Sequence, residues 1–184
     1  DDVTIENLRG NVLIQNGTLH LSKGTLGIIG ATAKMDAFYK NEGTQKAYFD
    51  YKINASEFDI KRAYNEIKMF REIVTAAESA EGIVGLNYSI KGVLNNQMEP
   101  VMPSLEGSGT LSVKKVKMKG FKLLNVVSAK TENPDIKDPD ISKVDIKTNI
   151  KNNIVTVDRF KFKVAGFRLR FEGQTSLDGK LNLK

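Results

Sequence analysis

The sequence predicts a mainly β protein: a curved antiparallel sheet built from successive hairpins, with one principal amphipathic helix near residues 57–80. Three observations lead to this prediction. Apolar and polar residues alternate over most of the chain, turn signals separate matching strand segments, and a single stretch has helical periodicity. The chain has 184 residues, of which 40% are hydrophobic, and this is enough for a substantial core. We therefore expect one domain over residues 1–184, arranged as an open β-groove or as a sandwich.

The first hairpin is expected at Asn16-Gly17, in the segment "NVLIQNGTLHL". Asn-Gly is a strong signal for a two-residue turn, because both turn residues need positive φ. This turn pairs Ile14 with Leu19 on an apolar face and places His20 beside Leu13 on the polar face. The next strand, "KAYFDYKINA", has an apolar face formed by Ala47, Phe49, Tyr51 and Ile53.

The segment "SEFDIKRAYNEIKMFREIVTAAESAEG" departs from this alternation. Its apolar residues recur at intervals of three and four, as they do on the buried stripe of a helix. They are Ile60, Ala63, Tyr64, Ile67, Phe70, Val74 and Ala77. Ser56 with Asp59 predicts a capping box at the start, and Gly82 predicts the stop. One long helix is therefore expected between two groups of strands.

After this helix, the strand "GLNYSIKG" places Leu86, Tyr88 and Ile90 on one face. A loop containing Pro100 and Pro103 follows. The segment "TLSVKKVKM" then predicts a second hairpin with Lys114-Lys115 at its turn, although Lys-Lys is a weak signal for such a turn. This pairing gives an apolar face on which lie Leu111, Val113, Val116 and Met118.

The third hairpin is predicted at Asn152-Asn153, in "TNIKNNIVTV", with Ile150 opposite Val155. The segment before it, "SAKTENPDIKDPDIS", contains Pro134 and Pro139 and is expected to be an exposed loop. The later segment "FRLRFEG" alternates again, with one face formed by Phe167, Leu169 and Phe171. Both ends of the chain have the pattern of strands, so we expect it to be a fragment of a longer protein.

Composition and motifs argue against several classes of function. The 28 basic and 22 acidic residues give a net charge of +6, which suits an anionic surface but is less concentrated than in nucleic-acid binders. No cysteine is present, so thiolate metal sites are excluded. His20 is the only histidine and belongs to a polar strand face, and Ser108 lacks the spacing of a nucleophile elbow. We therefore expect no enzyme, no metal and no cofactor.

The segment from Leu105 to Leu124 has glycine and apolar residues in a specific order. It reads L-x-G-x-G-x-L-x-V, a short turn, a second strand, Gly120 and an apolar group, and the chain closes with G-x-x-S-L-D-G-K-L-N-L. In this order of features, nearly the whole chain from Gly10 resembles the carboxy-terminal region of the AsmA-like proteins of bacterial cell envelopes. The Lys-Lys turn departs from that family, which often has an acid or asparagine followed by glycine there.

The resemblance implies a non-enzymatic protein of outer-membrane biogenesis. It also implies a periplasmic location, with an anchor in the bacterial inner membrane formed by an amino-terminal helix outside this chain. Related long members of the family form a β-groove thought to carry phospholipids across the periplasm. The partners implied are therefore phospholipids or other acyl-chain lipids, and envelope proteins, and not nucleic acids.

Two sets of candidate binding residues follow. Monomers rarely expose so large an apolar face, so something must cover the apolar faces of the hairpins, and acyl chains are one candidate. This candidate surface consists of Ile14, Leu19, Leu111, Val113, Val116, Met118, Ile150 and Val155. A candidate basic surface consists of Lys114, Lys115, Lys117, Lys119 and Lys122. The hairpin pairing places Lys117 and Lys119 on the polar face and so favours a solvated strand face as the explanation of these lysines. The apolar face could accept lipid, or it could be sealed by the helix or by folding on itself. The second case would make the protein a scaffold or interaction module for envelope partners.

Overall fold

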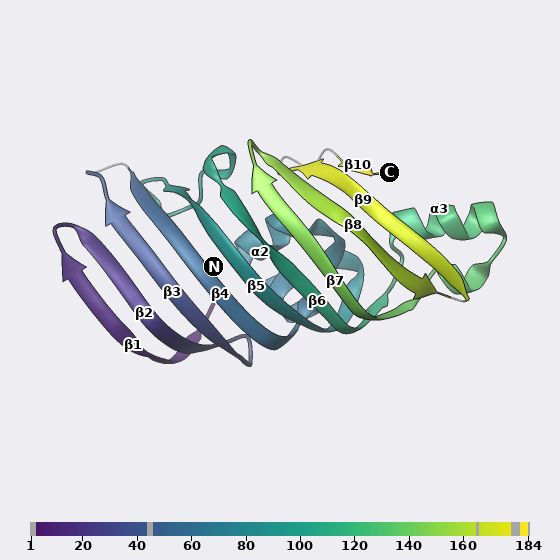
Figure 1. The fold of residues 1–184 in the computed structure, drawn as a ribbon, viewed down its shortest axis with the longest axis horizontal. Coiled ribbons are helices and arrows are strands. Elements are labelled where there is room, and N and C mark those ends of the chain that lie inside the picture. Colours follow the sequence, from purple (N-terminus) through teal and green to yellow (C-terminus); the bar gives the residue numbers. More distant parts are fainter. Residues whose placement is uncertain (1–2, 44–45, 165, 178–180, 184) are drawn as a thin grey trace.

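The strands form a single antiparallel sheet in a computed structural model that describes residues 3–43, 46–164, 166–177 and 181–183. Ten strands lie side by side in the order of the chain, as Figure 1 shows. Their bounds are β1 (Ile5–Gln15), β2 (Thr18–Ile28), β3 (Ala31–Asn41), β4 (Ala47–Asp59), β5 (Ala80–Leu94), β6 (Glu106–Met118), β7 (Asp140–Lys151), β8 (Ile154–Val164), β9 (Phe167–Ser176) and β10 (Leu181–Leu183). The first and last strands are the two edges, so the sheet is open. The predicted mainly β class is confirmed.

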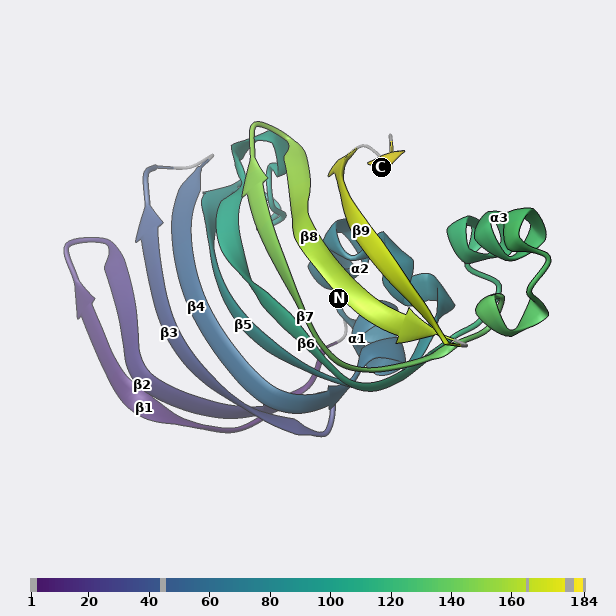
Figure 2. The ribbon, with the colours of Figure 1, turned by 45° about the vertical axis from the view of Figure 1, so that its right-hand side comes forward.

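The helical segments are short and lie in the connections between strands. Between β4 and β5 lie α1 (Ile60–Glu66), α2 (Lys68–Ile73) and the 3-10 turn η1 (Thr75–Ser79); η2 (Met102–Ser104) follows β5, and α3 (Lys122–Thr131) and η3 (Pro134–Ile136) precede β7. The strands bend along their length, and α1 and α2 lie on one side of the sheet (Figure 2). We call this side the inner face and the opposite side the outer face.

The prediction of one continuous helix near residues 57–80 is wrong, because this segment forms three shorter helical pieces, α1, α2 and η1. The backbone is extended at Ile67, with φ −110° and ψ 103°, and it leaves the helical region again at Val74. The first break releases carbonyl groups that the guanidinium of Arg71 satisfies, since it donates to the carbonyl oxygens of Tyr64 at 3.3 Å and Asn65 at 3.2 Å. The broken path still buries one residue or more from every segment: Ile60, Ala63, Phe70 and Ala77.

The predicted ends of this helix also need correction. Asp59 alone is the N-cap, because its carboxylate accepts a hydrogen bond from the backbone N–H of Arg62 at 2.9 Å. Ser56 lies in β4, and Gly82 lies in β5 and does not end a helix. The strand pattern therefore continues further toward the helical segment from both sides than the sequence indicated.

The first and third predicted hairpins are confirmed with their registers. Ile14 is opposite Leu19, and Ile150 is opposite Val155. Both residues of each turn have positive φ, 50° and 72° at Asn16-Gly17 and 53° and 64° at Asn152-Asn153, as a type I′ turn requires.

The second predicted hairpin is wrong, because β6 runs without a turn through Lys114-Lys115. Here Ile83 and Val84 of β5 are opposite Lys115 and Val113. One residue of β6, Lys114, is therefore extra, which is the pattern of a β-bulge. The bulge shifts the alternation by one position, so Val113 and Val116 are both buried. The sequence predicted this shared face correctly, but from a turn that does not exist.

The segment predicted as a loop before β7 contains the end of α3 and the turn η3. Leu124 of α3 and Ile136 of η3 are buried in the main core cluster. Helix α3 ends at Thr131, and its C-cap is Glu132, whose φ is 53°. A helical spacing of Phe121, Leu124 and Val127 is present in the sequence and could have predicted α3. The loop predicted around Pro100 and Pro103 is confirmed, with η2 inside it.

Candidate functional site

The inner face of the sheet carries a continuous row of cross-strand neighbours. Residues that are directly opposite in adjacent strands point to the same side, and one such row crosses the strands from β1 to β9. It runs through Val12, Leu21, Ala37, Tyr51, Ile90, Gly107, Ile150, Val155 and Thr175. Most of these residues are apolar, so the inner face is a single apolar surface from β1 to β9.

The eight predicted lipid-contacting residues all belong to this inner face by their register, but they differ in exposure. Five are buried in the core: Val113, Val116, Met118, Ile150 and Val155. Leu19 and Leu111 are half-buried. Ile14 is 73% exposed. The residues share a face, as predicted, but they do not form one accessible surface.

The chain itself covers the centre of the inner face. Phe70 of α2, Ala77 of η1 and Leu124 of α3 pack in one core cluster with Val113 and Val116. Toward the other end of the strands, Leu105 packs in a second cluster that also contains Ile150 and Val155. The middle of the apolar face is thus sealed by the helical connections and by the segment that contains η2.

The apolar face is accessible along β1 at one side of the sheet, and at Phe167 of β9, which is 45% exposed, toward the other. Every residue of β1 is exposed, and its large apolar side chains include Val12, at 57%, and Ile14, at 73%. We call Val12, Ile14 and the half-buried Leu19 of β2 the edge strip. Leu13 lies between the two exposed residues but on the outer face, opposite His20. Sequence periodicity predicted the face of Ile14, while its exposure results from its place in an edge strand.

The ring of Tyr88 covers the inner face beside β6 at the two positions, Gly107 and Gly109, where β6 has no side chain. This ring lies 3.2 Å from the Cβ position of Gly107 and closer still to that of Gly109, and the hydroxyl of Tyr88 is 2.9 Å from the Oγ1 atom of Thr148 in β7. Burial raises the pKa of Tyr88, and the hydrogen bond to Thr148 opposes that rise. The two glycines therefore make room for an aromatic ring.

The five predicted basic residues are all exposed: Lys114, Lys115, Lys117, Lys119 and Lys122. Lys119 forms an ion pair with Glu81 at 2.6 Å, and the hydrogen bond that Lys119 donates lowers the pKa of this carboxyl group. Lys122 is the first residue of α3 and the other four belong to β6 or directly follow it. They form a solvated margin at one end of β6.

His20 and Ser108 are both exposed and lie far apart in the sheet, on β2 and β6. The imidazole of His20 is in edge contact with Phe38, with ring centroids 6.4 Å apart. Within the described ranges, no three His, Asp or Glu side chains gather in an arrangement that could hold a metal ion. In the same part of the chain, no helix has the length and apolar character needed to cross a bilayer.

Comparison with known proteins gives no relative for this chain: no family model, no curated protein and no solved structure matches it. Residues 178–180, which belong to the closing motif of the sequence resemblance, lie outside the described residues.

Proposed function

We propose that this chain is part of a non-enzymatic protein of the bacterial cell envelope that acts in outer-membrane biogenesis, and that its inner sheet face takes up phospholipid acyl chains. In this proposal the protein lies in the periplasm and is held at the inner membrane by a segment outside this chain. The sequence resemblance to AsmA-like proteins supports the cellular role. The edge strip supports the lipid role, because it is an accessible end of a continuous apolar face.

The edge strip and the basic residues make different contributions to lipid binding. Each acyl methylene that leaves water contributes about 0.8 kcal/mol, so a few methylenes on Val12 and Ile14 give useful affinity. A lysine near an anionic membrane contributes about 1 kcal/mol, and salt screens this attraction over about 8 Å. The apolar strip therefore supplies the capture of an acyl chain, while the lysines supply a nonspecific attraction to the membrane.

A second function, that of a scaffold for envelope proteins, is favoured by the sealed centre of the inner face. Five of the eight predicted lipid-contacting residues are buried by the chain's own connections. A scaffold needs only the exposed edge, where backbone groups of β1 are free to pair with a strand of a partner protein.

Replacement of Ile14 tests the lipid role against a matched control on the same strand. Ile14→Asn places an amide on the inner face, and Leu13→Asn places one on the outer face at a residue that is 60% exposed. We expect Ile14→Asn to weaken the binding of a fluorescent phospholipid about tenfold and Leu13→Asn to leave it unchanged. Native mass spectrometry of gently purified protein should show bound phospholipid in the unmodified protein and in Leu13→Asn. An equal loss in both variants, or no phospholipid in any sample, would favour the scaffold.

A further inference from the structure

The adjacent strands β7 and β8 are paired only next to the turn that joins them, and we call the unpaired stretch between them the seam. These strands contain 12 and 11 residues, but they pair only over Thr148–Lys151 and Ile154–Val157. On either side of the seam the pairing is extensive, because β7 follows β6 along nearly its whole length and β8 follows β9. The strands separate beyond the turn, so the backbone groups that face the seam lack ladder partners there.

A cleft of about 350 Å³ occupies the seam. Val144 and Phe162 line it and are both only 7% exposed, so they form an apolar floor. Alternation along β8 places the charged residues on either side of Phe162 on the outer face, and the cleft therefore opens there. Four cationic side chains line it: Lys143, Lys161, Lys163 and Arg168.

Few negative charges lie near these four cations. Asp140 is the single carboxylate that lines the cleft, and within the described ranges none of the four cations forms an ion pair. A second outer-face cleft of about 360 Å³ shows the contrast, because its lining includes Asp50 and Glu106. There, Glu106 already holds Lys91 at 3.1 Å. The second cleft has Lys52, Lys91 and Lys151 against these two carboxylates, whereas the cleft in the seam has four cations against one, so its excess of positive charge is larger.

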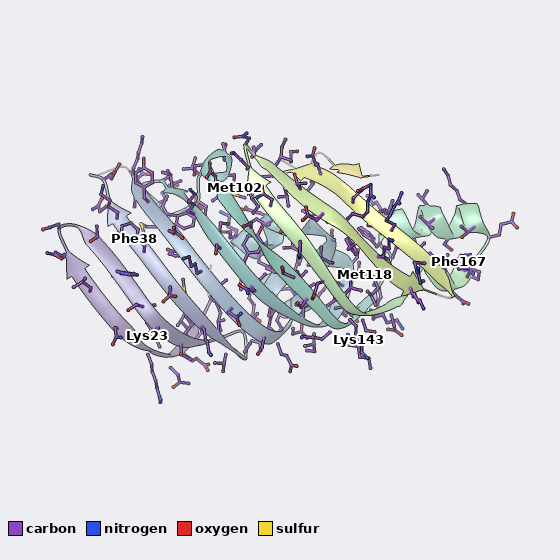
Figure 3. All side chains as sticks on the ribbon, in the orientation of Figure 1. Lys23, Phe38, Met102, Met118, Lys143 and Phe167 are labelled. Carbon is purple, nitrogen blue, oxygen red and sulfur yellow. The ribbon has the colours of Figure 1, made fainter. Side chains whose placement is uncertain are left out.

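Lys143 has an unusual backbone at the edge of this cleft. Its φ is 55°, in the left-handed region that lysine seldom adopts. Lys23 of β2 has the same feature, with φ 52°, but lines neither of the two clefts. Figure 3 labels both residues near the same long side of the sheet. Lys23 therefore serves as a control for Lys143, because it has the same backbone conformation but does not line a basic cleft.

We infer that the cleft in the seam binds a phosphate-bearing anion. Ammonium and guanidinium groups form strong charge-assisted hydrogen bonds with phosphate oxygens, and they reach this cleft from β7, β8 and the start of β9. Its volume is at the low end of the range for small-molecule sites, which suits a head group or a small phosphate ester. The site lies on the face opposite the edge strip, so it does not rest on the proposed uptake of acyl chains.

Two sources can supply the phosphate, a phospholipid head group and a soluble phosphate ester, and separate probes distinguish them. Binding of sn-glycerol 3-phosphate is measured by isothermal titration calorimetry. Sedimentation with phosphatidylcholine vesicles, with and without phosphatidylglycerol, measures binding to the anionic head group. Binding of either probe at the seam supports the inference, and the tighter one identifies the source.

The test variant is Lys143→Gln with Lys161→Gln, and the control is Lys23→Gln with Lys34→Gln. Both remove two charges from a net charge of +6, and both pair a positive-φ lysine with a lysine of an outer strand face. We expect the test variant to bind the preferred probe at least about tenfold more weakly and the control to stay within about twofold. Arg168→Gln, on a third strand, should also weaken binding without touching the backbone at Lys143.

The inference is overturned if the unmodified protein binds neither probe, or if the control loses as much affinity as the test variant. The second result would mean that net charge alone attracts the anion. Thermal unfolding of each variant shows whether the fold is retained. Binding of the fluorescent phospholipid by the edge strip is expected to persist in the test variant, so failure at the seam and failure of the lipid role are distinguishable.

Discussion

Gly82 fixes the geometry at the point where β5 and β6 change register. Its φ of 138° is one that side chains rarely allow, and a Cβ at this position would collide with the carbonyl oxygen of Lys115 and lie 2.9 Å from the Cα of Val116. The close approach lies next to the extra residue Lys114. A residue without a side chain therefore permits the bulge that turns both Val113 and Val116 inward.

Replacement of Gly82 by alanine should destabilise the protein far more than the same change at Gly120. Gly120 also has positive φ, 66°, but a Cβ there would meet nothing within 4 Å. We expect Gly120→Ala to lower the free energy of unfolding by about 1 kcal/mol from backbone strain alone. Gly82→Ala adds the collision with a central strand, and we expect a loss of about 3 kcal/mol or more. Urea unfolding measures both, and equal losses would show that the strands adjust freely.

At the same scale, the sequence predicted which way side chains point better than how exposed they are. Alternation assigned Ile14 and Val155 to one face, and the register confirms it. Their exposed fractions are nevertheless 73% and 3%. Periodicity reports only the direction of a side chain, whereas exposure depends on which distant segment covers it.

At the scale of elements, the backbone φ angles that a two-residue turn needs explain why one predicted hairpin forms and another is a β-bulge. Two-residue turns need two residues with positive φ, and asparagine and glycine adopt such conformations more readily than lysine does. Asn152-Asn153 meets this requirement. Lys114-Lys115 does not, and it continues as a strand between β5 and β7.

Glycine substitution should therefore have opposite effects in these two elements. Asn153→Gly supplies the residue preferred at the second position of a type I′ turn, and we expect it to stabilise the protein by about 0.5 kcal/mol. Lys115→Gly removes a side chain from a central strand, and we expect it to destabilise the protein by about 1 kcal/mol. The midpoints of chemical unfolding measure both changes. Stabilisation by Lys115→Gly would instead support the predicted second hairpin.

The helical connections could be predicted only in part. The apolar spacing from Ile60 to Ala77 correctly located helical segments, but it did not reveal the breaks at Ile67 and Val74. Those breaks depend on tertiary contacts, such as the hydrogen bonds that Arg71 donates to Tyr64 and Asn65. The basic cleft could not be predicted either, because nothing in the alternating pattern of β7 and β8 shows that their pairing stops after four residues.

At the scale of the whole molecule, the sheet is uneven from edge to centre. β5 pairs along most of its length with β4 on one side and β6 on the other, and helical connections cover its inner face. β1 pairs only with β2, through a ladder with two register shifts, and all of its residues are exposed. Local opening requires less free energy where few buried contacts hold a segment. β1, which carries Val12 and Ile14 of the edge strip, should thus be the least protected of the long strands.

Hydrogen–deuterium exchange should reveal this gradient in the isolated chain. We expect backbone amides of β1 to exchange at least roughly a hundredfold faster than those of β5 that pair with β4 or β6. The physical reason is that β1 can detach without disrupting the core, whereas β5 is released only when the sheet unfolds. Peptides covering residues 5–15 and 80–94 allow the comparison by mass spectrometry. Equal protection would contradict the open edge and would mean that β1 is covered in solution. Protection that falls on dilution would then identify the cover as a second copy of the chain, joined through its exposed edge.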